Sequence, residues 1–446
     1  MKIISVVGAR PNFMKIAPFI KATETFNAKL EANSSQLVAH LLVHTGQHYD
    51  DRMSKAFFES LGIPEADINL GIGSGSHAEQ VGNTMIAFEK VLLEEKPDWV
   101  VVVGDVNATL ACSVTAKKLH IKVCHIEAGL RSGDETMPEE INRLVTDRLS
   151  DLLLIPDQLS GENLRREGVP ENKIKFVGNI MIDTLESNRE AASKLKIRNI
   201  IKNNLLDSSF SPLGGTKGGR ASREKEAKPE INDIIQNNLL DTDSAQAFVP
   251  MQGDEGTSVP GGGKANNGYA ILTMHRPSNV DEKEILSPIL SFLTDEVAVD
   301  MPVIWPIHPR TQSRLKEFGL WEQAKACDNL ILLHPIGYHE MLRLNMQATI
   351  MLTDSGGLQE ECCVLGTPCL TLRWNTERPV TLKEHGGASV LVGNNIERIR
   401  EEYQTALKLN RTPQRPELWD GQTAMRCVEA IVNYPSTGSF TSLGNR

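Results

Sequence analysis

Short apolar runs alternate with amphipathic stretches along most of the chain. Runs at residues 3–7, 100–103 and 348–352 are largely apolar, and each is followed by polar residues and then by a helical pattern. Strands without polar alternation are typical of parallel sheets covered by helices on both faces. The pattern therefore predicts an α/β protein with two sets of doubly wound, Rossmann-like strands.

The alternation stops near residue 196 and resumes near residue 268. We expect an N-terminal domain over residues 1–186, a C-terminal domain over 187–417, and a last helix at about 418–436 that packs back on the first domain. Residues 196–267 are rich in Gly, Ser, Pro, Lys and Asn without a sustained period, which predicts a low-complexity, mobile insertion.

Composition narrows the class of protein. The 446 residues carry a net charge of −10, which argues against a general nucleic-acid or membrane-surface binder. The seven cysteines show no CxxC pair or other zinc-site spacing, and no apolar run reaches the length of a signal peptide or membrane span. We expect a soluble, cytoplasmic protein without a metal site.

The segment 353–361, TDSGGLQEE, carries the most chemistry. It follows a predicted buried strand and opens a helix, so Ser355, Gly356 and Gly357 would present free backbone N–H groups to an anion. Glu360 or Glu361 would then take the hydroxyls of a ribose, and the segment would hold a nucleoside diphosphate. The alternative is an ordinary N-cap in which Ser355 accepts from the backbone.

The loop after the first predicted strand lacks the G-x-G-x-x-G motif of a dinucleotide site. It reads GARP instead, and Arg10 and Lys15 bring positive charge there. This suits a phosphate but not a nicotinamide cofactor. The alternative for Lys15 is a solvated position on a helix.

Acidic and basic residues gather where predicted strands end. Asp105, Glu127 and Glu139 lie at or after strand ends of the first domain. The alternative for each residue alone is a helix cap or a surface charge. Crowded carboxylates separate their pKa values, which suits acid and base work. His275-Arg276 and His308 hold similar positions in the second domain and suggest phosphate or sugar contacts.

Taken together, the motifs of this chain resemble the non-hydrolysing UDP-N-acetylglucosamine 2-epimerases. The resemblance spans nearly the whole chain outside the insertion. It rests on GARP at 8–11, TGQH at 45–48, GD at 104–105, HIEAGLR at 125–131, PEEINR at 138–143, HR at 275–276, TDSGGLQEE at 353–361 and TERP at 376–379. One departure is that Pro277-Ser278-Asn279 follows His275-Arg276, where the family usually has Glu-Asn.

The resemblance implies a B-type glycosyltransferase architecture with the site in the cleft between two Rossmann-like domains. It implies roles for the following residues: Asp105, Glu127, Glu139 and His275 in catalysis; Arg10, Ser355, Gly356, Gly357 and Glu361 in substrate binding; Gln47 and His48 in binding a second UDP-N-acetylglucosamine as activator. We also expect Lys15, Arg276, His308 and Arg378 to contact the substrate. It also implies a homodimer that serves cell-surface polysaccharide synthesis.

The expected reaction is reversible conversion of UDP-N-acetylglucosamine to UDP-N-acetylmannosamine without a cofactor. The hydrogen on C2 is not next to a carbonyl, and oxidation would need a nicotinamide site that the first loop does not offer. Elimination of UDP to a glycal followed by re-addition remains. The alternatives are a hydrolysing 2-epimerase, an epimerase of a modified UDP-sugar, and a B-type glycosyltransferase.

Overall fold

The computed structural model describes residues 1–31, 37–46, 65–206 and 268–435. The chain forms two compact units: unit 1 contains residues 1–187 and the chain from Arg415 onward, and unit 2 contains residues 188–414. Among the described residues, no helix is both long enough and apolar enough to cross a membrane.

Unit 1 is built on a parallel sheet of seven strands within the described residues. Their order is β3-β2-β1-β4-β5-β6-β7. The strands are β1 (Lys2–Val7), β2 (Ala39–His44), β3 (Ile68–Asn69), β4 (Trp99–Val103), β5 (Lys122–Ile126), β6 (Leu152–Ile155) and β7 (Ile174–Phe176). The order reverses between β1 and β4, which pair in parallel from Ile3 opposite Trp99.

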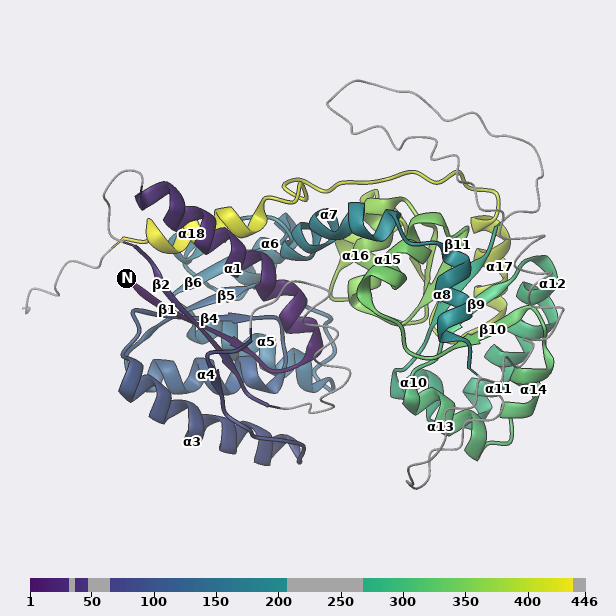
Figure 1. Cartoon of the computed structure of the whole chain (residues 1–446), viewed down its shortest axis with the longest axis horizontal. Helices are drawn as coiled ribbons and strands as arrows, with labels where there is room; N and C mark the ends of the chain where they lie inside the picture. Colours follow the sequence, from purple (N-terminus) through teal and green to yellow (C-terminus); the bar gives the residue numbers. More distant parts are fainter. Residues whose placement is uncertain (32–36, 47–64, 207–267, 436–446) are drawn as a thin grey trace, which may run out of the picture. The chain divides into compact units, whose positions relative to one another are not determined.

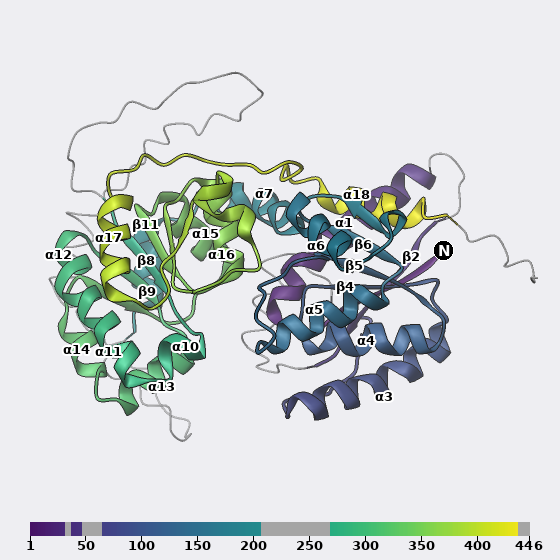
Figure 2. The same ribbon diagram turned by 180° about the vertical axis from the view of Figure 1, so that it is seen from behind.

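Helices cover both faces of this sheet (Figure 1). They are α1 (Arg10–Glu31), α3 (His77–Glu95), α4 (Asn107–Lys118), α5 (Pro138–Leu149), α6 (Gln158–Arg166), α7 (Ile180–Ser193) and α18 (Thr423–Val432). Phe88 and Leu92 of α3 and Cys112 of α4 pack with Ile4 and Val102 in one core. Figures 1 and 2 both show α3, α4 and α5 on one face, with α1, α6 and α18 on the other.

The end of the chain belongs to unit 1. The buried Trp419 donates from Nε1 to the carbonyl oxygen of Pro156 at 3.0 Å. The carboxylate of Asp183 accepts from the backbone N–H groups of Thr423 (3.1 Å) and Ala424 (2.7 Å), at the start of α18. The carboxylate of Asp183 thus supplies a partner for amides that the first turn of a helix leaves unpaired.

Unit 2 repeats the plan with six parallel strands within its described residues, ordered β10-β9-β8-β11-β12-β13. The strands are β8 (Ala270–Thr273), β9 (Val303–Pro306), β10 (Leu330–Leu333), β11 (Ile350–Thr353), β12 (Cys369–Thr371) and β13 (Ser389–Leu391). The helices are α8 (Ile197–Asn204), α10 (Pro277–Val280), α11 (Lys283–Phe292), α12 (Ala298–Asp300), α13 (Pro309–Glu317), α14 (Trp321–Ala326), α15 (Tyr338–Gln347), α16 (Gly356–Leu365) and α17 (Ile396–Ala406). The strand order reverses between β8 and β11.

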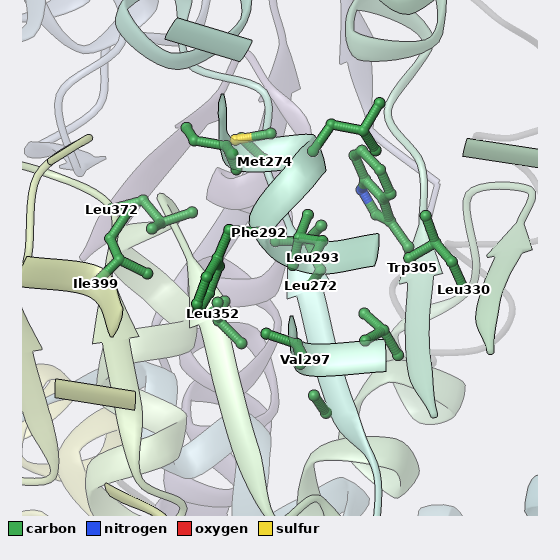
Figure 3. Packing of buried hydrophobic residues seen from close by; sticks show 14 of the residues in the cluster. Leu272, Met274, Phe292, Leu293, Val297, Trp305, Leu330, Leu352, Leu372 and Ile399 are labelled. Carbon is green, nitrogen blue, oxygen red and sulfur yellow. The ribbon is translucent and has the colours of Figure 1, made fainter. Parts of the chain in front are cut away.

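One face of the second sheet carries the larger core (Figure 3). Phe292 and Leu293 lie over Leu272 of β8 and Leu352 of β11, and Ile399 of α17 joins the same cluster. The opposite face is covered by α8, α15 and α16. Both faces are therefore apolar, which explains why the strands show no polar alternation.

The expected start of the insertion at residue 196 is wrong. The helix α8 forms there, because Ile197, Ile200 and Ile201 are spaced to share one face and bury it against the second sheet. The following Leu205 makes an antiparallel bridge with Leu333 of β10. Residues 207–267, the rest of the expected insertion, lie outside the described part of the chain.

Candidate functional site

The point where the strand order of unit 1 reverses brings three loops together. Parallel sheets bind ligands at such points, beyond the carboxyl ends of the strands. Gly104, just after β4, has φ of +68°, and a Cβ there would lie 3.3 Å from Lys15 Nζ and 3.4 Å from Asn12 Nδ2. Asn12 also donates to the carbonyl oxygen of Val103 at 2.7 Å. Glycine thus allows α1 to approach the end of β4.

Glu127 lies at this edge, directly after β5. Its φ is +67°, in the left-handed region that non-glycine residues rarely adopt. Its Oε2 pairs with Lys15 Nζ, and both side chains are buried. Lys15 is therefore not a solvated helix residue. Within the described structure, Glu127 Oε1 is buried without a hydrogen-bond partner.

Asp105 is held by a residue to which the sequence assigned no role. Arg143 of α5 pairs with Asp105 and donates from Nε to Glu140 at 2.8 Å. Burial raises the pKa of Glu140, but the backbone N–H of Ser132 and the charge of Arg143 lower it more, so it lies below its usual value. The motif PEEINR could have indicated this role, because the positive charge of Arg143 lies one helical turn after Glu139 and Glu140.

Glu139 lies at the exposed start of α5, beside the buried Glu140. The structure thus brings Lys15, Asp105 and Glu127 to one edge of the sheet. Glu139 precedes Glu140, which pairs with Arg143. Glu139 itself makes no ion pair among the described residues. Its catalytic role stays a prediction.

In unit 2, Asp354 organises the loop after β8. Its buried Oδ2 accepts from the backbone N–H groups of His275 and Arg276, each at 2.8 Å, and from Asn279 Nδ2 at 3.1 Å. Its Oδ1 lies 2.8 Å from His275 Nδ1. Burial raises the pKa of Asp354, but the contacts with His275 and Arg276 outweigh it, so the carboxyl stays ionised. Sequence reasoning missed Asp354, although it precedes the SGG turn.

His308 lies beside His275, with ring centroids 5.4 Å apart. Its Nδ1 accepts from the backbone N–H of Arg310 at 3.2 Å, which requires that nitrogen to be unprotonated. Burial and the neighbouring His275 both lower the pKa of His308. The ring is therefore neutral near pH 7 and presents its other nitrogen as a donor.

The segment after β11 starts α16 as an open helix end. Ser355 occupies the N-cap position, but its side chain makes no capping hydrogen bond, so the ordinary N-cap alternative is wrong. A Cβ on Gly356 would lie 2.6 Å from Arg378 Nη1 and 2.8 Å from Glu377 Oε1, whereas one on Gly357 would meet nothing within 4 Å. Glycine at 356 is thus required by the close approach of a buried Arg–Glu pair.

The two glutamates of α16 differ in environment. Glu360 accepts from Arg378 Nε at 2.7 Å. Glu361 is buried, and its Oε2 has no hydrogen-bond partner in the described part of the chain. Burial raises the pKa of Glu361 to about 7, and the charge of Glu360 adds to this, while hydrogen bonds from Tyr338 and Asn345 oppose it.

Other predicted site residues are placed less fully. Arg276 donates from Nε to the carbonyl oxygen of Asp354 at 2.9 Å. Arg10 begins α1, and its side chain is outside the described structure. Gln47 and His48 also lie outside the described residues, so their role in binding an activator stays a prediction.

A sequence profile of the UDP-N-acetylglucosamine 2-epimerase family matches residues 30–252 and 240–432. The UDP-N-acetylglucosamine 2-epimerase of Methanocaldococcus jannaschii is 38% identical over 97% of this chain and 99% of its own length. The UDP-2,3-diacetamido-2,3-dideoxy-D-glucuronate 2-epimerase of Pseudomonas aeruginosa is 34% identical, over 97% of this chain and 99% of its own.

Solved structures agree with these sequence matches. The M. jannaschii enzyme in complex with UDP-GlcNAc and UDP superposes with a TM-score of 0.75, at 37% identity, covering 97% of this chain and 99% of that one. This confirms the predicted fold class of two doubly wound α/β domains, as in the B-type glycosyltransferase architecture. From its sequence and its fold, the chain belongs to the UDP-N-acetylglucosamine 2-epimerase family.

Proposed function

We propose that this protein interconverts UDP-N-acetylglucosamine and UDP-N-acetylmannosamine without hydrolysing either. The support is the relationship to epimerases that carry this name, together with the carboxylates at the edge of the first sheet. The observation that carries the proposal is Glu127, a buried carboxylate that pairs with Lys15 through one oxygen and leaves the other unpartnered among the described residues.

The proposed chemistry begins with elimination. One carboxylate removes the proton from C2 while the C1–O bond breaks, and both electrons of that bond leave with UDP. The product is a glycal with a double bond between C1 and C2. A carboxylic acid on the other side then adds a proton to the opposite face of C2, and the UDP oxygen returns to C1. The two proton transfers thus need two carboxyl groups.

We assign one proton transfer to Glu127, because its Oε1 has no hydrogen-bond partner among the described residues while Lys15 holds Oε2 in place. The other is assigned to Asp105 or Glu139. Asp105 is held by Arg143, and its side chain is about one quarter exposed, so a substrate can reach it.

Unit 2 would hold the leaving group. The first turn of α16, with Ser355 making no capping bond, offers backbone N–H groups to the diphosphate. His275, held by Asp354, and the neutral His308 would donate further hydrogen bonds to phosphate oxygens. Such donors stabilise the negative charge that UDP gains as it departs.

A second candidate substrate is a UDP-linked diacetamido uronic acid. The 34% identity to the P. aeruginosa enzyme is nearly as high as the identity to the M. jannaschii enzyme, and both matches cover 97% of this chain. The two substrates differ at C3 and C6, so the chemistry at C1 and C2 would be the same for both.

Proton NMR in heavy water tests the function directly. With UDP-N-acetylglucosamine, we expect deuterium at C2 of an intact UDP-sugar and a new set of UDP-N-acetylmannosamine signals. Free N-acetylmannosamine would instead identify a hydrolase. Exchange only with the diacetamido uronic acid would select the second substrate, and no exchange with either sugar would contradict the proposal.

We also propose that the enzyme is a homodimer acting in the cytoplasm on precursors of cell-surface polysaccharides, as the sequence resemblance implies. In unit 1, the apolar side chains Ile86 and Leu93 of α3 and Ile141 of α5 are about half exposed, which suits a partner surface. Light scattering on the purified protein tests this; a monomer at all concentrations would contradict it.

A further inference from the structure

His125, a buried histidine on β5, connects the two turns that carry Asp105 and Glu127. His125 has 0% exposure, and its Nε2 lies 2.8 Å from the carbonyl oxygen of Gly104, the residue before Asp105. Its Nδ1 lies 2.6 Å from Asp147 Oδ1 on α5. The ring therefore spans from the end of β4 to α5.

Asp147 continues the connection to the second turn. Its Oδ2 accepts from the backbone N–H of Gly129 at 3.0 Å, two residues after Glu127, and lies 2.8 Å from Arg131 Nη1. Arg131 is itself paired with Glu167. A chain of polar contacts thus runs from Gly104 through His125 and Asp147 to the turn that carries Glu127.

The contacts of His125 define its protonation state. A carbonyl oxygen and a carboxylate are both acceptors, so both ring nitrogens must carry a hydrogen. A ring with a hydrogen on both nitrogens is an imidazolium, which would form a buried ion pair with Asp147. Burial raises the pKa of Asp147, but the charges of His125 and Arg131 lower it by more, so this pKa lies below its usual value.

Stability alone is a weak reason for such a pair. A buried ion pair gives little net stability compared with well-packed apolar side chains of similar volume. Its distinctive effect is geometric, because it makes two directional contacts to two different turns. Gly104 and Glu127 both depend on positive φ angles, so their turns gain from being fixed by a third group.

We propose that His125, as an imidazolium bound to Asp147, is a positioning residue that holds the Gly104–Asp105 turn against the Glu127–Gly129 turn. It fixes the spacing of the two carboxylates without touching the substrate. This role deepens the proposed function and rests on it, because spacing matters only if both carboxylates act on one sugar carbon.

Three substitutions separate positioning from packing. The single nitrogen of the new side chain in His125→Gln cannot reach both acceptors. Asp147→Leu leaves His125 Nδ1, the Gly129 N–H and Arg131 Nη1 without this carboxylate. Asp147→Asn keeps the hydrogen bonds, because its oxygen still accepts from Gly129 and Arg131 and its NH2 donates to Nδ1 of a neutral ring. We expect the first two to lower kcat on the order of a hundredfold with KM little changed, and Asp147→Asn to keep most of the activity.

His40→Gln is the matched control. His40 is a partly buried histidine of β2 that lies beside Ile3 of β1, at the opposite end of the same sheet, with Nε2 2.8 Å from Ser5 Oγ. Its loss should leave kcat unchanged. Unchanged kcat in both His125→Gln and Asp147→Leu, or an equal loss in Asp147→Asn, would overturn the proposal.

Two readouts do not depend on the reaction. Nitrogen-15 NMR of the unliganded wild type should show two protonated ring nitrogens at His125, and one unprotonated nitrogen would overturn the assignment. Amide hydrogen exchange over residues 104–106 and 127–131 should be faster in His125→Gln or Asp147→Leu than in His40→Gln. If no UDP-sugar exchanges its C2 hydrogen, the proposed function fails, but these two measurements still decide the role of His125. If His125→Gln does not fold, the Asp147 variants allow the same comparison.

Discussion

Glu127 shows how much one residue can combine: a left-handed backbone, an ion pair with Lys15 and a buried oxygen without a partner in the described structure. The sequence could place this carboxylate at a strand end, because strand ends follow from hydrophobic runs. It could not show that Lys15 lies against it, since the two residues are 112 positions apart and meet only through the order of strands β1, β4 and β5.

Replacing Glu127 by Gln should lower kcat by about 10²- to 10⁴-fold, the usual contribution of one acid or base group. The amide keeps the shape of the side chain but cannot accept the C2 proton. Binding of UDP, measured by calorimetry, should change little because the change leaves intact the phosphate donors proposed in unit 2, which are His275, His308 and the first turn of α16. The exposed Glu135→Gln serves as control, and deuterium exchange at C2 at the wild-type rate in Glu127→Gln would contradict the assignment.

Glu361 predicts a pH-dependent stability. Its pKa is about 7 in the folded protein, against 4.5 for an unperturbed side chain. Between these values the folded state keeps a proton that the unfolded state has lost, so the free energy of unfolding falls as pH rises from 4.5 to 7. The loss should be on the order of 3 kcal/mol, and Glu361→Gln should abolish it.

Urea unfolding at pH 5 and pH 8 measures this effect as the difference between wild type and Glu361→Gln. The exposed Glu384→Gln should show the wild-type dependence on pH. An identical dependence in Glu361→Gln and wild type would mean that Glu361 is ionised in the folded protein at both pH values.

Among the secondary-structure elements, the start of α16 could be predicted from the sequence, whereas α8 was not. The start of α16 was predictable, because Ser-Gly-Gly after an apolar run marks a strand, a turn and a helix. The helix α8 was missed although Ile197, Ile200 and Ile201 have helical spacing. The helix has only eight residues and adjoins a long segment without periodicity, so its pattern was too short to stand out. Its helical character became clear only because its isoleucine face is buried against the second sheet.

At the start of α16, Gly356→Ala should destabilise the protein by about 1–3 kcal/mol, the usual cost of overpacking. Its Cβ would meet Arg378 and Glu377, which are buried and paired with each other. Gly357→Ala is the matched comparison, since its Cβ meets nothing within 4 Å and alanine favours a helix. Equal thermal stability of the two variants would contradict this reading of Gly356.

In α8, Ile201→Ala should cost about 2–4 kcal/mol, because it leaves a cavity against the second sheet. The exposed neighbour Lys202→Ala should cost almost nothing. Denaturant unfolding measures both, and a small effect at Ile201 would mean that α8 is dispensable for unit 2.

At the scale of the whole molecule, the alternating pattern was enough to predict two doubly wound domains. It could not give the order of the strands, because parallel strands of similar apolar composition do not show in their sequences which strands are neighbours. That order matters for function. It puts the loops after β1 and β4 beside each other in unit 1, and those after β8 and β11 in unit 2.

The chain between α8 and β8 allows a test at the same scale. Leu206 donates its backbone N–H to Leu332 at 2.9 Å, and β8 begins at Ala270, so both ends of the segment are anchored in unit 2. Replacing residues 207–266 with a short Gly-Ser linker should leave turnover nearly unchanged. Complete loss of activity in a folded deletion variant would show that the segment takes part in function.

The C-terminal helix α18 has a consequence for how the protein is made. Unit 1 needs Trp419 and α18 to cover its own strands and helices, yet these residues leave the ribosome only after all of unit 2. Unit 2 can therefore complete its fold during translation. Until α18 is made, unit 1, most of which is translated first, keeps an apolar surface exposed. A nascent chain stalled before residue 415 should hold a protease-sensitive unit 1 beside a resistant unit 2, reversing the usual order in which the first-made domain finishes first.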